Sequence, residues 1–250
     1  MKEEGDFMGL FRYIGLKEKD IVSIIGAGGK TSLMFQLAHE LRKNNVRVLL
    51  TTTTKIYVPQ KEMVDFICID ENKFAENAKI NKKGIHIYGT EVNTENKMIG
   101  LNENHLNDLA SYFDYVLIEA DGAKKKKIKG WDDDEPVVYG ATTKTIGILD
   151  IQAFGMRICE SNVHRSERFC KMTHSKEGEN ITLDHLLSVV VHPQGLFKNA
   201  KGEKILFVNK ADDINYLNKA EQLKVKMNMH SSMGLNKIII GSIKNNRYYV

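Results

Sequence analysis

The sequence contains little cysteine: three residues in 250, none of them in a C-x-x-C pair. An odd number of cysteines without metal-ligand spacing argues against a disulfide framework and against a cysteine-based zinc site. We expect all three, Cys68, Cys159 and Cys170, to be core residues. Their scarcity also fits a reducing compartment, so we expect a cytoplasmic protein.

The sequence also lacks long apolar runs and a large excess of one charge. No stretch reaches the roughly 18 consecutive apolar residues of a membrane span. Residues 1–6 are charged and lead into no apolar run, so we expect no signal peptide. Lysine and arginine total 36 against 32 acidic residues, a net charge of +4. So small an excess gives no reason to expect nucleic acid or a membrane as a partner.

What the sequence does contain is a series of short apolar segments that alternate with segments of helical periodicity. Residues 21–25, 30–43 and 46–50 read as a strand, a helix and a second strand, which form a βαβ unit with parallel strands. Further strands are predicted at 65–69, 84–88, 115–120, 145–149, 205–208 and 237–240, and helices at 105–112, 183–191 and 216–227. This pattern predicts a three-layer α/β fold of the P-loop NTPase type, with a doubly wound, mostly parallel sheet that binds ligands at the carboxyl ends of its strands.

The length and the periodicity predict one domain with an insertion. We expect residues 1–250 to form a single P-loop NTPase-like domain, with a cap or insertion around 124–200 that covers the site. Within that range, residues 124–134 change abruptly from basic to acidic, and we expect them to form a solvated loop.

The strongest motif is the glycine-rich turn between the first predicted strand and the first predicted helix. Glycines allow successive backbone N–H groups to point at a phosphate, and a helix that begins there adds the positive end of its dipole. We expect Lys30 to reach the β- and γ-phosphates and the Thr31 hydroxyl to ligate Mg²⁺. The predicted nucleotide-binding residues of this loop are Gly26, Ala27, Gly28, Gly29, Lys30, Thr31 and Ser32.

The loop has the shorter form G-x-x-G-K-[ST], which resembles the loop of Mur-type ligases, because Ile24 stands where the longer P-loop pattern has glycine. The alternative interpretation is a glycine-rich turn with an incidental lysine. Strand, turn and helix follow one another in the required order, however, so we predict that the chain binds a nucleoside triphosphate.

Two carboxylates end the apolar strand predicted at 115–120. Glu119 and Asp121 are two residues apart, so both point to one side. A P-loop protein needs a carboxylate there to hold Mg²⁺ and to orient an attacking water. We expect Thr31 and Asp121 to hold the metal, and Lys30, Glu119 and Asp121 to be the catalytic residues. Alternatively, the acids only mark the point where the strand meets solvent.

A candidate for base recognition follows the strand predicted at 205–208. The segment Asn209-Lys210-Ala211-Asp212 matches the N-K-x-D motif of GTPases. A carboxylate at Asp212 can accept from both the N1–H and the 2-amino group of guanine, whereas adenine offers an acceptor at N1 and no 2-amino group. We therefore predict GTP, with ATP as the alternative, and expect Lys210 over the base and Asn209 tied to the phosphate region. The competing interpretation is a polar cap of the following helix.

Two further groups of residues are candidates for contacts with substrate. Thr54 and Lys55 end the second strand, where they could reach the γ-phosphate or Mg²⁺, or simply form a strand terminus. The lysines 124–127, together with Lys129, lie next to the acidic strand end and could close over an anionic ligand, although such runs are usually solvated.

A third candidate group lies in the expected insertion. His164, Arg165 and Arg168 occur close together in a polar stretch, where they could bind a second anionic substrate.

Six short motifs, in order along the chain, resemble the YqeC family. They are G-A-G-G-K-T-S, T-T-T-T-K, E-A-D-G-A-K, E-P-V at 135–137, V-H-R-S-E-R-F at 163–169 and N-K-A-D-D. The resemblance covers residues 9–243. The family is described as accessory proteins for selenium-dependent molybdenum hydroxylases. The resemblance therefore implies a role in selenium cofactor biosynthesis, with a molybdenum hydroxylase or its maturation factors as partner.

Three functions remain open on the sequence. The first is an Mg²⁺-dependent GTPase or NTPase that acts as an accessory factor in selenium cofactor biosynthesis. The second is an ATP-dependent kinase or ligase that activates a small substrate. The third is a nucleotide-gated binding module that does not hydrolyse its ligand.

Overall fold

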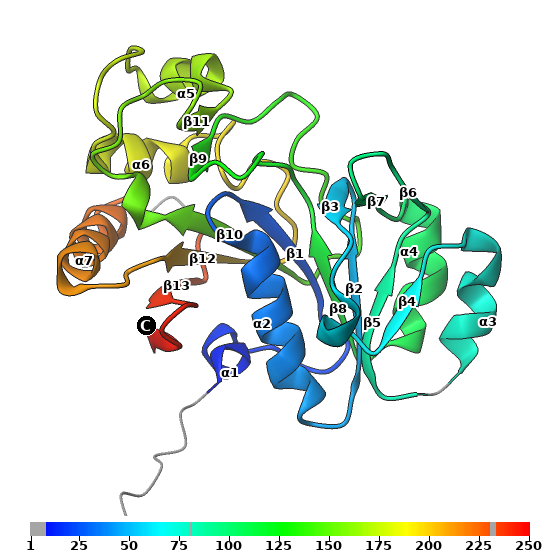
Figure 1. Cartoon of the computed structure of the whole chain (residues 1–250). Coiled ribbons are helices and arrows are strands. Elements are labelled where there is room, and N and C mark those ends of the chain that lie inside the picture. The colour runs from blue at the N-terminus through cyan, green and yellow to red at the C-terminus, as the bar shows by residue number, and fades with distance from the viewer. Residues whose placement is uncertain (1–8, 81, 231–233) are drawn as a thin grey trace, which may run out of the picture.

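A computed structural model of the chain describes residues 9–80, 82–230 and 234–250. A nine-stranded sheet crosses the molecule in the order β14-β13-β12-β10-β1-β8-β2-β5-β4 (Figure 1). Its neighbouring strands pair in parallel, except for the antiparallel pair of β13 and β14 at one edge. The predicted three-layer α/β class with a mostly parallel sheet is confirmed.

The strands of the main sheet are β1 (Ile21–Gly26), β2 (Arg47–Thr52), β4 (Phe66–Cys68), β5 (Gly84–Tyr88), β8 (Tyr115–Glu119), β10 (Lys144–Asp150), β12 (Glu203–Asn209), β13 (Lys237–Ser242) and β14 (Arg247–Tyr249). Two small sheets lie outside it. One is antiparallel and contains β3 (Lys55–Tyr57), β7 (Lys97–Ile99) and β6 (Glu91–Val92); the other is the parallel pair β9 (Ile128–Lys129) and β11 (Val163–His164).

The α-helices are α1 (Leu10–Ile14), α2 (Lys30–Arg42), α3 (Phe74–Lys79), α4 (Glu103–Leu109), α5 (Ser166–Thr173), α6 (Leu183–Val191) and α7 (Ile214–Asn228). Short 3-10 turns lie at η1 (Lys61–Met63), η2 (Glu71–Lys73), η3 (Ala110–Tyr112) and η4 (Ile151–Ala153).

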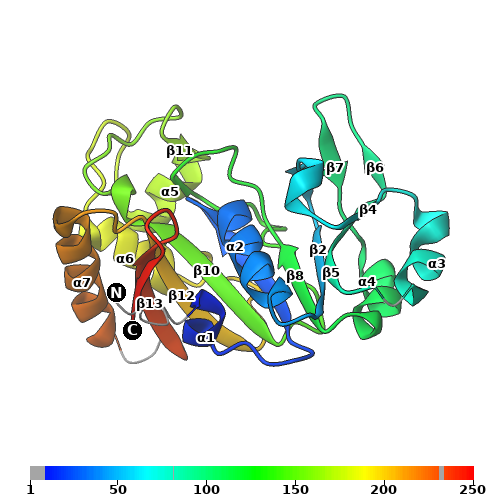
Figure 2. The ribbon, with the colours of Figure 1, turned by 60° about the horizontal axis from the view of Figure 1, so that its bottom comes forward.

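Helices cover both faces of the main sheet because alternate residues of a strand point to opposite sides. In β1, Ile24 packs in a core with α1 and α2, whereas Ile25 packs in a core with α6 and α7. In β8, Leu117 belongs to the α2 side and Val116 to a core with α3 and α4. Figure 2 shows α1 and α2 together on one side of the sheet. Both faces are thus apolar, as in the middle layer of a three-layer fold.

Parallel pairing brings the carboxyl ends of eight strands to one edge of the sheet, and six neighbouring strands among them frame the candidate site. In the register of the ladder, Ile24 of β1 pairs with Glu119, and Asp150 of β10 pairs with Asn209. In spatial order, β2, β8, β1, β10, β12 and β13 end in Thr52, Glu119, Gly26, Asp150, Asn209 and Ser242. The candidate site is built at this edge.

The range 124–200, expected to form a cap or insertion, surrounds one strand of the main sheet. Strand β10 lies within this range and occupies a central place between β1 and β12. The residues before and after β10 form β9, β11, α5 and α6, which share an apolar core with α7. Figure 1 shows α5, β9 and β11 above the carboxyl ends of the strands.

The solvated loop expected at 124–134 is wrong for residues 128–131, whereas Asp133 and Asp134 are exposed. Ile128, Lys129 and Trp131 are buried, and β9 pairs with β11. The buried ammonium of Lys129 is compensated by Asp121 at 3.3 Å and Glu135 at 2.6 Å. The change from basic to acidic residues along the sequence suggested solvent exposure, but the carboxylates of Asp121 and Glu135 neutralise Lys129 inside the fold.

Among the described residues, no helix combines the length and the apolar character that a membrane crossing needs. The three cysteines are free: Cys68 is buried, and Cys159 and Cys170 are half-buried. Residues 1–6, from which we expect no signal peptide, lie outside the described residues.

Candidate active site

The loop between β1 and α2 contains glycines at the points where neighbouring strands pack against it. Gly28 and Gly29 have φ values of 89° and 136°. A Cβ at Gly28 would lie 2.2 Å from Cβ of Asp150, and one at Gly29 would lie 2.5 Å from Nδ2 of Asn209. Both positions therefore require glycine, for the left-handed backbone and for the close approach of β10 and β12. The amide of Ala27 is already used, because it donates to the carbonyl of Ile148 at 3.2 Å.

Lys30 and Thr31 begin α2 and face the acidic end of β8. Nζ of Lys30 donates to the Gly26 carbonyl at 2.6 Å and lies 3.2 Å from Asp121 Oδ1. Oγ1 of Thr31 donates to Oε2 of Glu119 at 2.6 Å. Burial would lower the pKa of Lys30, but Asp121 and Glu119 outweigh it and hold the pKa above its ordinary value. Lys30 is therefore a charged ammonium group at neutral pH.

Asp121 is fully buried behind this loop. Its carboxylate accepts from the amide of Gly26 at 3.1 and 3.0 Å and from Nε1 of Trp131 at 3.0 Å. Nζ of Lys129 lies 3.3 Å from Oδ2, while Lys30 contacts Oδ1. Both oxygens thus have donors from the protein itself. Asp121 links the predicted phosphate loop, residues 26–32, to the segment that carries Lys129 and Trp131.

Glu119 has a different environment, because it lines a cleft. Burial raises the pKa of its carboxyl group, and Lys30 and Thr31 offset this only in part. Its Oε2 and the Thr31 hydroxyl are adjacent oxygen atoms, and oxygen is the donor atom that Mg²⁺ takes in proteins. In the part of the chain that the structure describes, no three His, Cys, Asp or Glu side chains are grouped to hold a metal ion. A metal here would take its remaining ligands from phosphate and water.

The N-K-x-D segment is tied to the phosphate loop. Nδ2 of Asn209 donates to the carbonyl of Gly28 at 2.9 Å. Nζ of Lys210 lies 2.5 Å from Oδ2 of Asp150, a fully buried carboxylate at the end of β10. The predicted tie between Asn209 and the phosphate region is therefore present in this geometry.

Asp212 is held by side chains on both sides. Its Oδ2 accepts from Nε2 of Gln152 at 2.9 Å, and its Oδ1 accepts from Oγ of Ser242 at 2.5 Å. Asp213 is the N-cap of α7, where its Oδ1 accepts from the amides of residues 215 and 216. The capping role considered for this segment is thus filled by Asp213, and Asp212 is not needed for it.

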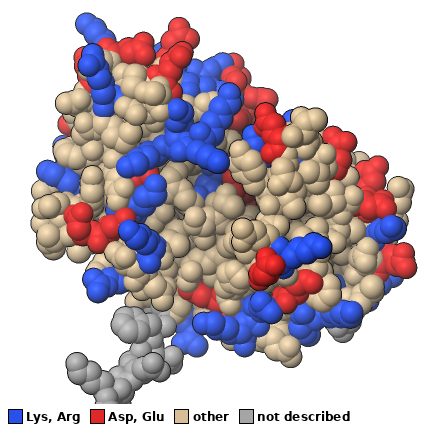
Figure 3. Space-filling model, viewed as in Figure 1, with Lys and Arg blue, Asp and Glu red and all other residues tan. Residues whose placement is uncertain are grey.

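A cleft of about 1290 Å³ opens beside the loop. Figure 3 shows Lys and Arg side chains gathered around a hollow at the upper centre of this face. The cleft is lined by Gly28, Gly29, Lys30, Thr31, Ser32, Thr53, Thr54, Lys55, Ile56, Tyr57, Glu95, Lys97, Ile99, Glu119, Gly122, Ala123, Lys124, Lys125, Lys126, Glu135 and Lys210. The structure therefore brings the candidates Thr54 and Lys55 into one cleft with the phosphate loop, whereas Asp212 lies outside this lining.

The candidates in the insertion lie elsewhere. Arg165 forms an ion pair with Glu135 at 2.6 Å, and Arg168 forms one with Asp132 at 2.6 Å. Burial, together with the charge of Arg165, lowers the pKa of His164 to about 4, so its imidazole is neutral at pH 7. His164, Arg165, Arg168 and the buried Lys129 do not line the cleft.

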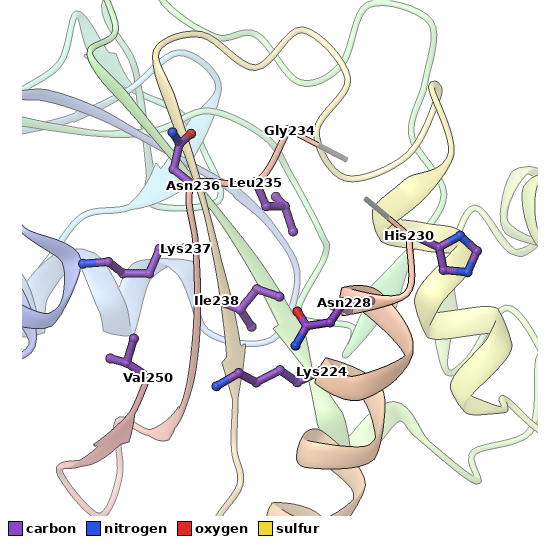
Figure 4. Close-up of a pocket in the computed structure, with 10 residues that line it drawn as sticks. Lys224, Asn228, His230, Gly234, Leu235, Asn236, Lys237, Ile238 and Val250 are labelled. Atoms are coloured by element: carbon purple, nitrogen blue, oxygen red, sulfur yellow. The ribbon is translucent and has the colours of Figure 1, made fainter. Parts of the chain in front are cut away.

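A separate hollow of about 490 Å³ lies between the end of α7 and the start of β13 (Figure 4). Lys237, on its wall, donates to the carbonyl of Tyr13 at 2.7 Å. Because β13 begins there and ends at the site edge, this hollow lies at the opposite end of the strand from the phosphate loop. It contributes no group to the candidate site.

Comparisons with known proteins identify a family and a relative of the chain. The YqeC protein family matches residues 22–167, which contain the phosphate loop and the acidic strand end. A protein of Escherichia coli (strain K12), named "Uncharacterized protein YqeC", is 30% identical over 198 residues, which cover 78% of this chain and 77% of the relative. The chain belongs to the YqeC family. The resemblance inferred from the six motifs is confirmed. No solved structure matches the chain.

In this YqeC-family protein, three residues of the candidate site were not predicted from the sequence. Asp150 and Ser242 each end a strand that had been predicted, so the same signal that singled out Glu119 would have found them. Gln152, which orients Asp212, follows no such pattern. Its position depends on the turn after β10, which periodicity does not define.

The contacts of Asp121 predict a large stability effect. Asp121→Asn removes the charge that faces two buried lysines, so the free energy of unfolding should fall by about 3 kcal/mol, as for a broken buried ion pair. Urea denaturation measures this loss. Asp133→Asn is the matched control, because Asp133 forms an exposed ion pair with Arg168, and exposed ion pairs contribute little to stability. Equal losses in the two variants would contradict the structural role of Asp121.

Proposed function

We propose that the chain is an Mg²⁺-dependent nucleoside triphosphate-binding protein that hydrolyses GTP. The observation that carries the proposal is the convergence of the Lys30 ammonium group and the Thr31–Glu119 oxygen pair at the glycine loop before α2. A cation, a helix amino terminus and two hard oxygens at one point match the charges of a triphosphate and its metal ion.

In this proposal the phosphates are bound by the glycine loop, by the amino terminus of α2 and by Lys30. Helix α2 has 13 residues, and its first N–H groups have no partner within the helix. They lie beside the cleft, together with the charged side chain of Lys30. The phosphates would therefore meet hydrogen-bond donors and positive charge from the same short segment.

In this proposal Glu119 and Asp121 have separate roles. Glu119 and Thr31 hold Mg²⁺, because their oxygens are adjacent and line the cleft. Asp121 acts behind the loop, because Gly26, Lys30 and Trp131 already occupy its oxygens. When bound, Mg²⁺ neutralises charge on the β- and γ-phosphates.

The preference for guanine rests on Asp212. Gln152 and Ser242 each donate one hydrogen bond to its carboxylate, and each carboxylate oxygen has a second lone pair for the base. The segment that carries Asp212 also contacts the phosphate loop and its neighbouring strand. Asn209 donates to the carbonyl of Gly28, and Lys210 pairs with Asp150 at the end of β10.

The biological role in the proposal comes from the family resemblance. We place the nucleotide cycle in the maturation of selenium-dependent molybdenum hydroxylases, with such an enzyme or its maturation factors as the partner. An increase in the rate of GTP hydrolysis when the partner is added would support this role. An unchanged rate would contradict it.

Lys30→Ala should weaken binding of Mg²⁺·GTP by roughly 100-fold, because a charge-assisted hydrogen bond contributes about 1.5–3 kcal/mol. Isothermal titration calorimetry measures the affinity. Lys43→Ala, at the opposite end of α2, removes the same charge away from the loop and serves as the control. If both variants bind the nucleotide equally well, the phosphate-loop assignment is wrong.

Glu119→Gln should weaken Mg²⁺-dependent nucleotide binding by at least about tenfold, because changing even the groups that orient metal ligands costs about 10–100-fold in metal affinity. Since burial raises the pKa of Glu119, the wild-type protein should lose Mg²⁺ affinity on acidification at a higher pH than an ordinary glutamate would. The variant should lack this pH dependence. Titrations of Mg²⁺ at several pH values test both points, and an unchanged pH profile in the variant would remove Glu119 from the metal site.

Asp212→Asn should weaken GTP binding by at least about tenfold, because a hydrogen bond to a charged acceptor contributes about 1.5–3 kcal/mol. The same variant should gain affinity for xanthosine triphosphate, which presents an acceptor where guanine has its 2-amino group. Asp213→Asn is the control, since it alters only the cap of α7. The guanine assignment fails if the ratio of GTP to xanthosine triphosphate affinity is the same in both variants.

A further inference from the structure

The cleft extends past the phosphate loop on the side away from the N-K-x-D segment. Asn209 ends β12, two strands to one side of β1, whereas β2 lies two strands to the other side and leads into β3. We propose that the space between β3, β7 and the lysines 124–126 binds a second, phosphate-bearing ligand beside the nucleotide. This inference rests on the proposed function, because it assumes that the phosphate loop holds the nucleotide.

The size of the cleft allows two ligands. Sites for one drug-sized molecule usually have volumes of about 300–1,000 Å³. The cleft measures about 1290 Å³, and its lining includes β3 and β7 as well as the phosphate loop. The triphosphate end of a nucleotide at the loop would therefore leave the β3 side open.

Positive charge on this side is not balanced by the protein. The whole cleft lining contains seven lysines, three glutamates and no arginine. Lys30 and Lys210 belong to the phosphate loop and the N-K-x-D segment and pair with Asp121 and Asp150, so five lysines, at positions 55, 97 and 124–126, lie on this side. Each glutamate is already engaged: Glu95 by Lys97, Glu119 by Thr31, and Glu135 by Lys129 and Arg165. Within the described ranges, Lys55, Lys124 and Lys125 form no ion pair. Their charges favour an anion in the space that they share.

Two lysines from different segments meet at one aromatic ring. Nζ of Lys125 lies 4.6 Å from the ring centroid of Tyr57, and Nζ of Lys97 lies 5.2 Å from it. The Tyr57 side chain lines the cleft, and its face attracts cations. The ring therefore holds one lysine of β7 and one lysine of the 124–126 segment at the wall of the cleft. Of these two, Lys97 is paired with Glu95, which leaves the charge of Lys125 available to an anion.

The backbone of the lysine segment supports a binding role. Lys124 and Lys125 have φ values of 44° and 62°, so two successive residues with side chains adopt the left-handed conformation. Such conformations persist only where surrounding contacts impose them, and they cluster at ligand sites. Here the amide of Lys126 donates to the carbonyl of Ala123 at 2.9 Å, and its Nζ donates to that of Ser161 at 2.5 Å. These contacts hold Lys124 and Lys125 at the cleft.

The chemistry of the lining indicates a phosphate. Lysine is a compact point charge that binds phosphate without fixing its orientation, whereas planar carboxylate recognition favours arginine. The ligand class is therefore a small molecule with a phosphate or diphosphate group.

The test uses the full chain saturated with Mg²⁺ and a non-hydrolysable GTP analogue, so that the phosphate loop is filled. Pyrophosphate is then titrated by calorimetry. The wild-type protein should bind one equivalent. Lys124→Ala/Lys125→Ala should weaken this binding by roughly tenfold, the loss expected for two exposed charge contacts, and change the affinity for the analogue less than threefold. Lys43→Ala/Lys201→Ala removes the same net charge elsewhere and should behave as wild type.

Three results would overturn the inference. Pyrophosphate fails to bind the saturated wild-type protein, or it binds both double variants equally, or the Lys124→Ala/Lys125→Ala variant loses analogue affinity as strongly as pyrophosphate affinity. The last result would assign these lysines to the nucleotide. If the wild-type protein does not bind the analogue at all, the proposed function itself fails, which distinguishes the two conclusions.

Discussion

The site depends on one buried carboxylate, that of Asp121. It accepts from the Gly26 amide and the Trp131 indole and faces Lys30 and Lys129, although it has no exposed surface. A buried charge is tolerated only when donors surround it, so these four groups must keep their places for the fold to be stable. The loop that we assign to phosphate is thereby fixed to the insertion before any ligand binds.

Because of this constraint, the two carboxylates at the end of β8 have different roles. Asp121 is occupied by the protein, which leaves Glu119 and Thr31 as the oxygen ligands that line the cleft. On the other side of the loop, the side chains of Asp150 and Asn209 pack closely against Gly28 and Gly29. These contacts hold the ends of β10 and β12 next to the loop. This edge of the cleft is therefore already ordered before a ligand binds. Preorganisation of this kind reduces the free-energy cost of ordering side chains when a charged ligand binds.

Much of this arrangement could be predicted from the sequence, because strands that end in polar residues define the ligand edge of a parallel sheet. The glycine loop and the N-K-x-D segment were predicted from motifs that each follow a predicted strand, and the family was identified from the six motifs in order along the chain. The division of roles between Glu119 and Asp121 could not be predicted, because a period of two places both on one side but does not say which one lines the cleft. That depends on Lys129 and Trp131, whose burial contradicts the polar character of their segment. The sheet of β3, β6 and β7 was missed because its strands have only two or three residues.

The most direct test of the central claim is a crystal structure of the chain with Mg²⁺ and a non-hydrolysable GTP analogue. The account predicts that the β- and γ-phosphates lie against Lys30 and the first amides of α2, with Mg²⁺ between Thr31 and Glu119 and the base at Asp212. An analogue bound elsewhere, with the Lys30 ammonium group still on the Gly26 carbonyl and no phosphate at the loop, would contradict it.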